Sequence, residues 1–165
     1  MRSRDARPAD LEVVVEWVTS RQECELWAGP GISFPLAPRA FSAQIDMRGA
    51  TNVALDDEGG LAAFGQVLRR SPGRAHLARL IVRPDARRRG IGRALVQELL
   101  SRAAGAGLSS VTLNVYSDNA AALALYTDLG FRRAERPPGD PPSAGAWFMQ
   151  RGSGLPASNA GADAQ

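Results

Sequence analysis

The feature that most constrains this chain is a turn rich in arginine and glycine between an apolar stretch and an amphipathic one. It covers residues 83–94 and reads Arg-Pro-Asp-Ala-Arg-Arg-Arg-Gly-Ile-Gly-Arg-Ala. Two glycines one residue apart, Gly90 and Gly92, let the main chain approach a ligand closely. A helix that begins there directs unpaired N–H groups and the positive end of its dipole at that ligand. The turn therefore predicts a site for an anion such as a polyphosphate.

Length and composition indicate one globular domain. The chain has 165 residues, 44% hydrophobic and 22% charged, and we assign 1–151 to the domain and the small, polar stretch 152–165 to a disordered tail. With no long apolar run and a polar N-terminus, we expect a cytoplasmic protein without a membrane partner. The single cysteine, Cys24, is expected to be a buried small side chain. All 20 basic residues are arginine, which excludes chemistry that needs a lysine.

The hydrophobic pattern predicts an α/β fold with a mixed sheet. A short edge strand at 2–7 precedes a helix with a core stripe of Leu11, Val14, Val15 and Val18, from which Trp17 is offset. An irregular segment with short helical pieces follows from 22 to 45. Strands at 52–55, 61–68 and 75–82 form an antiparallel meander, and the helix 92–104 with the strand 111–115 adds a parallel β-α-β pair. A helix from Asp118 or Asn119 to Gly130 and two closing strands, at 131–133 and 146–150, complete the domain.

Spacing excludes several familiar nucleotide loops. A Walker loop needs a lysine, and the stretch from Gly90 to Leu95 lacks the third small residue of a dinucleotide fingerprint. Clustered histidines and cysteines are absent from the sequence, so we expect no metal site. The arginines concentrate at 83–93 instead of alternating with aromatic residues, so we expect no nucleic-acid partner. Strong, salt-dependent DNA binding would restore that alternative.

Two segments together resemble the GNAT acetyltransferase superfamily. Residues 87–92, Arg-Arg-Arg-Gly-Ile-Gly, resemble its Q/R-x-x-G-x-G/A signature. Residues 119–131, Asn-Ala-Ala-Ala-Leu-Ala-Leu-Tyr-Thr-Asp-Leu-Gly-Phe, resemble its N-x-x-A-x-x-L-Y-x-x-x-G-F pattern. The resemblance covers about 77–131 and implies the GNAT fold, with transfer of an acetyl group from acetyl-CoA to a primary amine by direct attack in a ternary complex. It also makes a homodimer possible.

The resemblance implies a coenzyme A site built mainly from main-chain groups. The pyrophosphate would lie on the N–H groups at the start of the helix, and the preceding strand would pair with the pantetheine arm. The alternative for the three arginines is a solvated basic turn. The residues assigned to cofactor binding are Leu80, Ile81, Val82, Arg87, Arg88, Arg89, Gly90, Ile91, Gly92, Arg93 and Asn119.

Catalytic roles are assigned to Tyr126 and His76. Tyr126 matches the tyrosine of the motif, which the resemblance makes the acid for the departing thiolate, and the alternative is a packed core tyrosine. A main-chain N–H near Leu80 or Ile81 would steady the oxyanion. His76, the only histidine, lies in register with Ala78, Leu80 and Val82 and would be the base. A packed or exposed histidine, with water relaying the proton to Glu23 or Glu25, is the alternative.

The acceptor is expected to bind within the irregular segment. Glu23, Glu25, Trp27 and Phe34 would form an acidic, aromatic pocket for a cationic amine such as a peptide amino group, a polyamine or an aminoglycoside-like molecule. The alternative for Trp27 and Phe34 is that they only cover the core. Asn119 has helix capping as its alternative. The competing function is a non-catalytic acyl-CoA sensor, which turnover with any amine would exclude.

Overall fold

The computed structural model describes residues 1–29 and 31–152. In this part of the chain one seven-stranded sheet has the order β1-β2-β3-β4-β5-β7-β6. Neighbouring strands are antiparallel except β4 and β5, which are parallel. The strands are β1 (Arg2–Asp5), β2 (Thr51–Asp57), β3 (Gly60–Ser71), β4 (Arg74–Val82), β5 (Ser110–Tyr116), β6 (Arg132–Arg133) and β7 (Ala146–Arg151). This topology confirms the predicted antiparallel meander followed by a parallel β-α-β pair.

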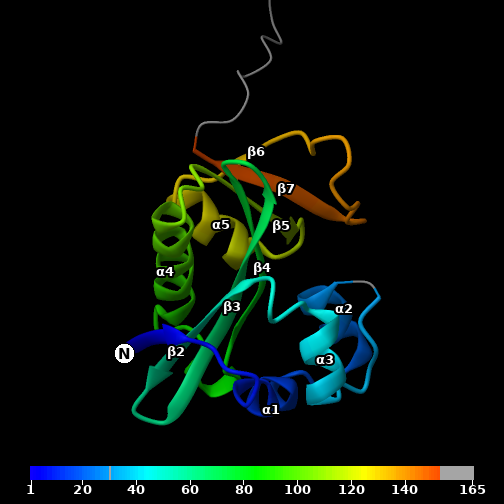
Figure 1. Ribbon diagram of the computed structural model, residues 1–165, viewed down its shortest axis with the longest axis vertical. Helices are drawn as coiled ribbons and strands as arrows, with labels where there is room; N and C mark the ends of the chain where they lie inside the picture. The colour runs from blue at the N-terminus through cyan, green and yellow to red at the C-terminus, as the bar shows by residue number, and fades with distance from the viewer. Residues whose placement is uncertain (30, 153–165) are drawn as a thin grey trace, which may run out of the picture.

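Helices cover both faces of the sheet (Figure 1). On one face, α4 (Ile91–Gly105) and α5 (Ala120–Asp128) pack on a core that includes Leu77, Leu95 and Leu99. On the other, three short helices cover a second core around Phe41 and Phe64. These are α1 (Asp10–Val14), α2 (Arg21–Ala28) and α3 (Pro38–Gln44); two 3-10 turns, η1 (Val15–Trp17) and η2 (Pro84–Ala86), complete the set. The sheet therefore separates two apolar layers.

The prediction that Trp17 is offset from the core stripe is wrong. Trp17 is 8% exposed and belongs to the second core with Val14. The α-helix ends at Val14 and tightens into η1, where residues three apart eclipse one another. The tighter winding brings Trp17 onto the buried face. Cys24, by contrast, is fully buried as predicted.

Two further expectations concern the ends and surroundings of the chain. The predicted disordered tail lies outside the described residues except for Gly152. In the part of the chain that the structure describes, no helix combines the length and apolar character that crossing a bilayer needs.

Candidate active site

The site begins where the two parallel strands separate. β4 and β5 pair only from Arg74 with Ser110 to Leu77 with Leu113, after which they diverge. Between the diverging strands lies a cavity of about 380 Å³, closed by α2, α5 and the loop before β7. The divergence leaves the second half of β4 with a free edge on that side, and a free edge can bind an extended polar chain through main-chain hydrogen bonds.

The main chain of β4 shows which residues face the free edge. Arg83 N–H donates to Ala62 O of β3 at 2.8 Å. Because main-chain groups alternate in direction along a strand, Ile81 also faces β3, whereas Leu80 and Val82 face the open side. The carbonyl of Val82 accepts from Arg87 Nε at 3.2 Å, which agrees with that direction. Of the three residues expected to pair with pantetheine, Leu80 and Val82 have suitable geometry and Ile81 does not.

The turn after β4 leaves the start of α4 uncapped. Gly90 adopts a left-handed conformation with φ of 79°, and no side chain of the described residues caps the helix. The first helical hydrogen bond runs from Ala94 N–H to Gly90 O at 3.1 Å. The N–H groups of Ile91, Gly92 and Arg93 therefore point out of the helix end without partners in the helix, as an anion site requires.

Arginines surround this helix end. Arg87, Arg88 and Arg89 are exposed, and Arg88 also has a positive φ, of 65°. Arg93 pairs with Asp128 of α5 at 2.9 Å on the surface. The three exposed arginines and the uncapped helix together form a concentration of donors and positive charge that fits a pyrophosphate.

A bulge in β4 corrects the predicted register of His76. Phe64 and Gln66 of β3 pair with Ile81 and Ala78, so β4 has one extra residue there. Arg79 lies in the bulge with a φ of 54°. The extra residue reverses the alternation of side chains. His76 therefore faces the layer of α1 to α3, whereas Leu80 and Val82 pack on the α4 and α5 side.

Tyr126 lies on the α5 side of the cavity. Its ring packs edge-on against Phe131 with centroids 5.9 Å apart, and it also lines the cavity. Burial raises the pKa of Tyr126 to about 12, so the phenol keeps its proton at neutral pH. Asn119 lines the same cavity while its side chain caps α5, accepting from Ala122 N–H at 3.1 Å. The capping role is thus present in the structure.

A series of side-chain hydrogen bonds holds His76 on the side of the cavity opposite Tyr126. Thr112 Oγ1 donates to Ala75 O at 3.0 Å and so accepts from His76 Nδ1–H at 2.9 Å. Asn114 Nδ2 lies 3.5 Å from His76 Nε2, and Asn114 Oδ1 accepts from Arg136 at 2.8 Å. Burial, followed by the positive charge of nearby arginines, lowers the pKa of His76 to about 4. The imidazole is therefore neutral at pH 7, with its proton on Nδ1, and is a weak base.

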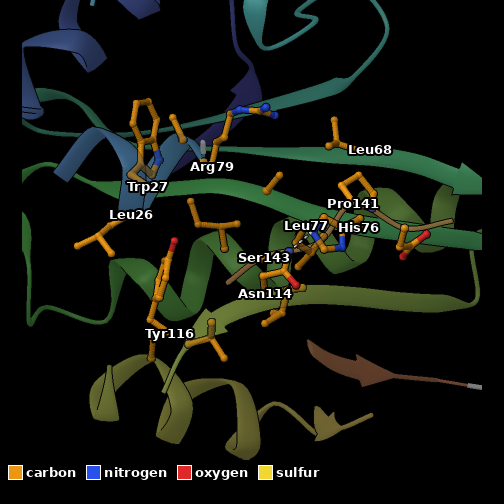
Figure 2. Close-up of a pocket in the computed structure, with 18 of the residues that line it drawn as sticks. Leu26, Trp27, Leu68, His76, Leu77, Arg79, Asn114, Tyr116, Pro141 and Ser143 are labelled. Carbon is orange, nitrogen blue, oxygen red and sulfur yellow. Dashed lines mark hydrogen bonds between the residues drawn. The ribbon is translucent and has the colours of Figure 1, made fainter. Parts of the chain in front are cut away.

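The loop between β6 and β7 closes the cavity over His76. Asp140 accepts two hydrogen bonds from Arg74, at 2.6 and 2.8 Å, and both side chains are largely buried. Arg136 donates to Pro141 O at 2.9 Å and lies over the ring of Phe148. Figure 2 shows Pro141 of this loop near His76 in that view of the pocket. The loop is held in place by ion pairing and hydrogen bonds.

The cavity does not have the acidic character that the sequence predicted. Of the four expected residues only Trp27 lines it, packed against Phe41 at 5.3 Å between ring centroids. Glu23 instead accepts from the main chain and hydroxyl of Thr19, at 2.8 and 2.9 Å, because it follows the N-cap Ser20 by three residues. Phe34 packs at the edge of the second core, and Glu25 is exposed.

Sequence reasoning missed Asn114, Arg79 and Arg136. Asn114 and Thr112 share one face of β5, and the alternate positions 111, 113 and 115 are apolar, so that pair of polar positions was a usable signal. The position of Arg79 in the cavity depends on the bulge, and that of Arg136 depends on the path of a loop. The sequence pattern indicates neither.

Comparison with known proteins identifies the family. The model of the acetyltransferase (GNAT) family matches residues 14–131. The chain belongs to the acetyltransferase (GNAT) family. It is an acetyl-CoA-dependent acyltransferase, and N-acetyl transfer is the activity that its relatives share.

Two relatives and one solved structure illustrate the similarity. The [ribosomal protein bS18]-alanine N-acetyltransferase of Escherichia coli K12 is 35% identical over 102 residues, covering 62% of this chain and 68% of that protein. The N-alpha-acetyltransferase RimI of Mycobacterium tuberculosis is 34% identical over 139 residues, covering 81% and 84%. The crystal structure of the ribosomal-protein-S18-alanine N-acetyltransferase from E. coli superposes with a TM-score of 0.69 at 26% identity, covering 96% and 97%.

Proposed function

We propose that this GNAT domain acetylates a primary amine by direct attack in a ternary complex, and that the acceptor is the α-amine of a peptide. The observation that supports this most is the continuous cavity with a free β4 edge and Tyr126 at one side and His76 at the other. Such a cavity can admit two substrates from different faces of the sheet. The names of two relatives, an alanine N-acetyltransferase and an N-alpha-acetyltransferase, favour an α-amine.

The residues present fit coenzyme A. Leu80 and Val82 would pair with the pantetheine arm along the free edge, and the N–H groups of residues 91–93 would hold the pyrophosphate. The exposed side chains of residues 87–89 would add charge-assisted hydrogen bonds. Bound acetyl-CoA supplies an acetyl group activated as a thioester.

Tyr126 is the proposed acid. As the amine nitrogen bonds to the acetyl carbon and the bond from that carbon to sulfur breaks, Tyr126 donates its phenolic proton to the sulfur and later regains one from water. A pKa of about 12 keeps the phenol protonated until it is needed. The N–H of Leu80, which faces the open edge, is the proposed donor that stabilises the negative charge developing on the carbonyl oxygen.

The acceptor amine needs no strong base here. Arg70, Arg79 and Arg136 line the cavity. Positive charges nearby lower the pKa of an amine, so a neutral, nucleophilic amine is favoured inside. After attack the nitrogen releases its extra proton to water at the cavity mouth. His76 then has a positioning role, holding Asn114 and the wall of β5.

The test is product formation by mass spectrometry with acetyl-CoA and a short peptide that begins with alanine. Wild-type protein is expected to add one acetyl group at the α-amine, while Tyr126→Phe slows turnover and the surface variant Arg48→Gln does not. Arg48 is exposed and lies outside the cavity. Stabilisation by acetyl-CoA without turnover on any peptide or small amine would support the acyl-CoA sensor instead.

A further inference from the structure

The acceptor side of the cavity carries positive charge that the protein does not neutralise. Arg70, Arg79 and Arg136 line it against one carboxylate, Asp140, which is already paired with Arg74. Across residues 1–29 and 31–152, no carboxylate lies within 4.0 Å of a nitrogen of the Arg70 or Arg79 side chain. The excess positive charge affects neighbouring groups: burial is the larger cause of the lowered pKa of both Arg79 and His76, and Arg70 is the second cause.

The wall formed by α2 and β4 also holds donors that lack acceptors. Arg79 donates from Nη1 to Gln66 Oε1 at 2.9 Å, but its buried Nε has no hydrogen-bond partner among the described residues. The buried Nε1 of Trp27 also has no hydrogen-bond partner among these residues. Both residues line the cavity, and Figure 2 shows them at the same end of it. Buried donors without partners are rare, and cost free energy, unless a ligand supplies acceptors.

Arg70 is the side chain best placed to meet a ligand. It is exposed near the end of β3, lines the cavity, and makes no side-chain hydrogen bond within the described part of the chain. Trp27 and Arg79 are less exposed than Arg70, and Arg70 is close enough to Arg79 to lower the pKa of its guanidinium, so a ligand beside them meets donors and positive charge. A polyamine or an aminoglycoside would meet repulsion there.

We propose that this surface, Arg70, Arg79 and Trp27, is an anion subsite that selects acceptors with a carboxylate close to the reactive amine. The proposal rests on the proposed function and names its substrate class. A carboxylate has only acceptor oxygens and negative charge, and so complements a wall that offers only donors and positive charge. The source of the carboxylate is an acidic side chain next to a peptide N-terminus, or the carboxylate of a free amino acid.

The experiment compares acceptors that differ only in charge. Three peptides of equal length, with amidated C-termini, begin Ala-Glu-Glu, Ala-Gln-Gln and Ala-Arg-Arg, and free alanine is compared with alaninamide. We expect kcat/KM for the Glu peptide to exceed that for the Arg peptide by about tenfold or more at low salt, mainly through KM, and the difference to shrink as salt is added. Preference for alanine over alaninamide would identify the free amino acid as the source. Equal or reversed values throughout would overturn the proposal.

Variants separate the subsite from general charge. The readout is the ratio of kcat/KM for the Glu peptide to that for the Arg peptide: Arg70→Gln should reduce this ratio, and Arg70→Glu should reverse it in favour of the Arg peptide. Arg48→Gln removes one surface arginine outside the cavity and should leave the preference unchanged. Because Arg79 is partly buried, Arg79→Gln risks misfolding. The second probe is therefore Trp27→Phe, which keeps an aromatic side chain, although a smaller one, and removes the N–H. Unchanged preference in both Arg70 variants and in Trp27→Phe would refute the assignment.

A binding measurement distinguishes failure of the subsite from failure of the proposed function. The N-acetylated Glu and Arg peptides are titrated calorimetrically into protein saturated with coenzyme A. If no peptide is acetylated, the proposed function is wrong, but tighter binding of the Glu peptide that is lost in Arg70→Gln still supports the subsite. If peptides are acetylated without regard to charge and bind equally, the proposed function stands and the subsite is wrong.

Discussion

His76 and Thr112 are direct partners across the parallel pair of β4 and β5, and the imidazole donates from Nδ1 to the threonine hydroxyl at 2.9 Å. Because that hydroxyl donates to Ala75 O, the tautomer of His76 is fixed. The remaining nitrogen, Nε2, faces Asn114. The only histidine of the chain is thus integrated in the wall of the cavity, and it marks the last part of the sheet before the strands diverge.

A first prediction concerns the pH dependence of the acetylation rate. The pKa of His76 is lowered to about 4, so His76 does not change protonation between pH 6 and 9. We expect the alkaline rise in kcat/KM to keep its midpoint in His76→Gln, because the titrating group is the acceptor amine. The measurement is a pH profile for both proteins with one peptide. Flattening of the rise in the variant would show that His76 is the base after all.

The lowered pKa of His76 also makes the stability of the fold sensitive to acid. Between its ordinary pKa of 6.5 and the folded value of about 4, the unfolded chain binds more protons than the folded one, so stability falls as the pH is lowered. Near pH 4 the loss from this residue approaches about 3 kcal/mol. Denaturant unfolding of wild type and His76→Gln at pH 7 and pH 4.5 tests this: the drop should be smaller in the variant. An equal drop would contradict it.

Tyr126→Phe should lower kcat by about 10²-fold or more while KM for acetyl-CoA stays near the wild-type value, since an acid acts only in the transition state. The ring still packs against Phe131, so the free energy of unfolding should change little. The check is steady-state kinetics together with thermal unfolding. A variant with normal kcat would restrict Tyr126 to packing.

Gly92→Ala should raise stability without loss of cofactor affinity. A Cβ at this position would meet Leu125 at 3.8 Å and Val82 at 3.9 Å, which is ordinary contact, and alanine favours a helix by about 1 kcal/mol over glycine. The signature that residues 87–92 resemble admits alanine at this position, so the methyl group should not obstruct a pyrophosphate at the helix end.

Thermal unfolding with and without acetyl-CoA measures both effects of that substitution. Wild-type protein at about 100 times the dissociation constant should gain about 2.7 kcal/mol. The variant should have a higher Tm without ligand and about the same gain with it. A strongly diminished gain would contradict the prediction that the site admits alanine at this position.

Asp140→Asn should release the loop before β7. The change removes the charge that holds Arg74 in a largely buried pair, with contacts at 2.6 and 2.8 Å. We expect KM for the peptide acceptor to rise several-fold while KM for acetyl-CoA is unchanged, because the loop covers the acceptor side. Arg48→Gln serves as the control. Equal changes in both KM values would show that the loop supports the whole cavity.

The sheet could be predicted because its signals are local. Alternating apolar residues, the turn at 56–60 and the glycines around α4 each specify their own segment, so the meander and the β-α-β pair followed directly. The motifs located two parts of the candidate site: Gly90 precedes α4 and Tyr126 lines the cavity, while their roles stay predictions. Its acceptor side depends on which segments meet in space, and no short-range pattern encodes that.

The incorrect predictions have specific physical origins. Trp17 is buried because α1 tightens into a 3-10 turn. Glu23 does not reach the cavity because it forms a capping box with Ser20 at the start of α2, a pattern that the sequence does contain. The register of His76 with Leu80 failed because a single bulge reverses the order of faces. A positive φ at Arg79 is unusual for a side chain of that size and could not be inferred from composition.

The bulge at Arg79 puts the side chain of His76 on the opposite face of β4 from those of Leu80 and Val82. In the proposed arrangement, His76 lies beside the acceptor, and the free main-chain edge at Leu80 and Val82 binds the cofactor. Under that proposal, substitutions at Arg70, His76 or Arg79 would change which amine is accepted and leave the acyl donor site intact. A chain built this way can acquire new acceptors in evolution without having to reinvent its source of acetyl groups.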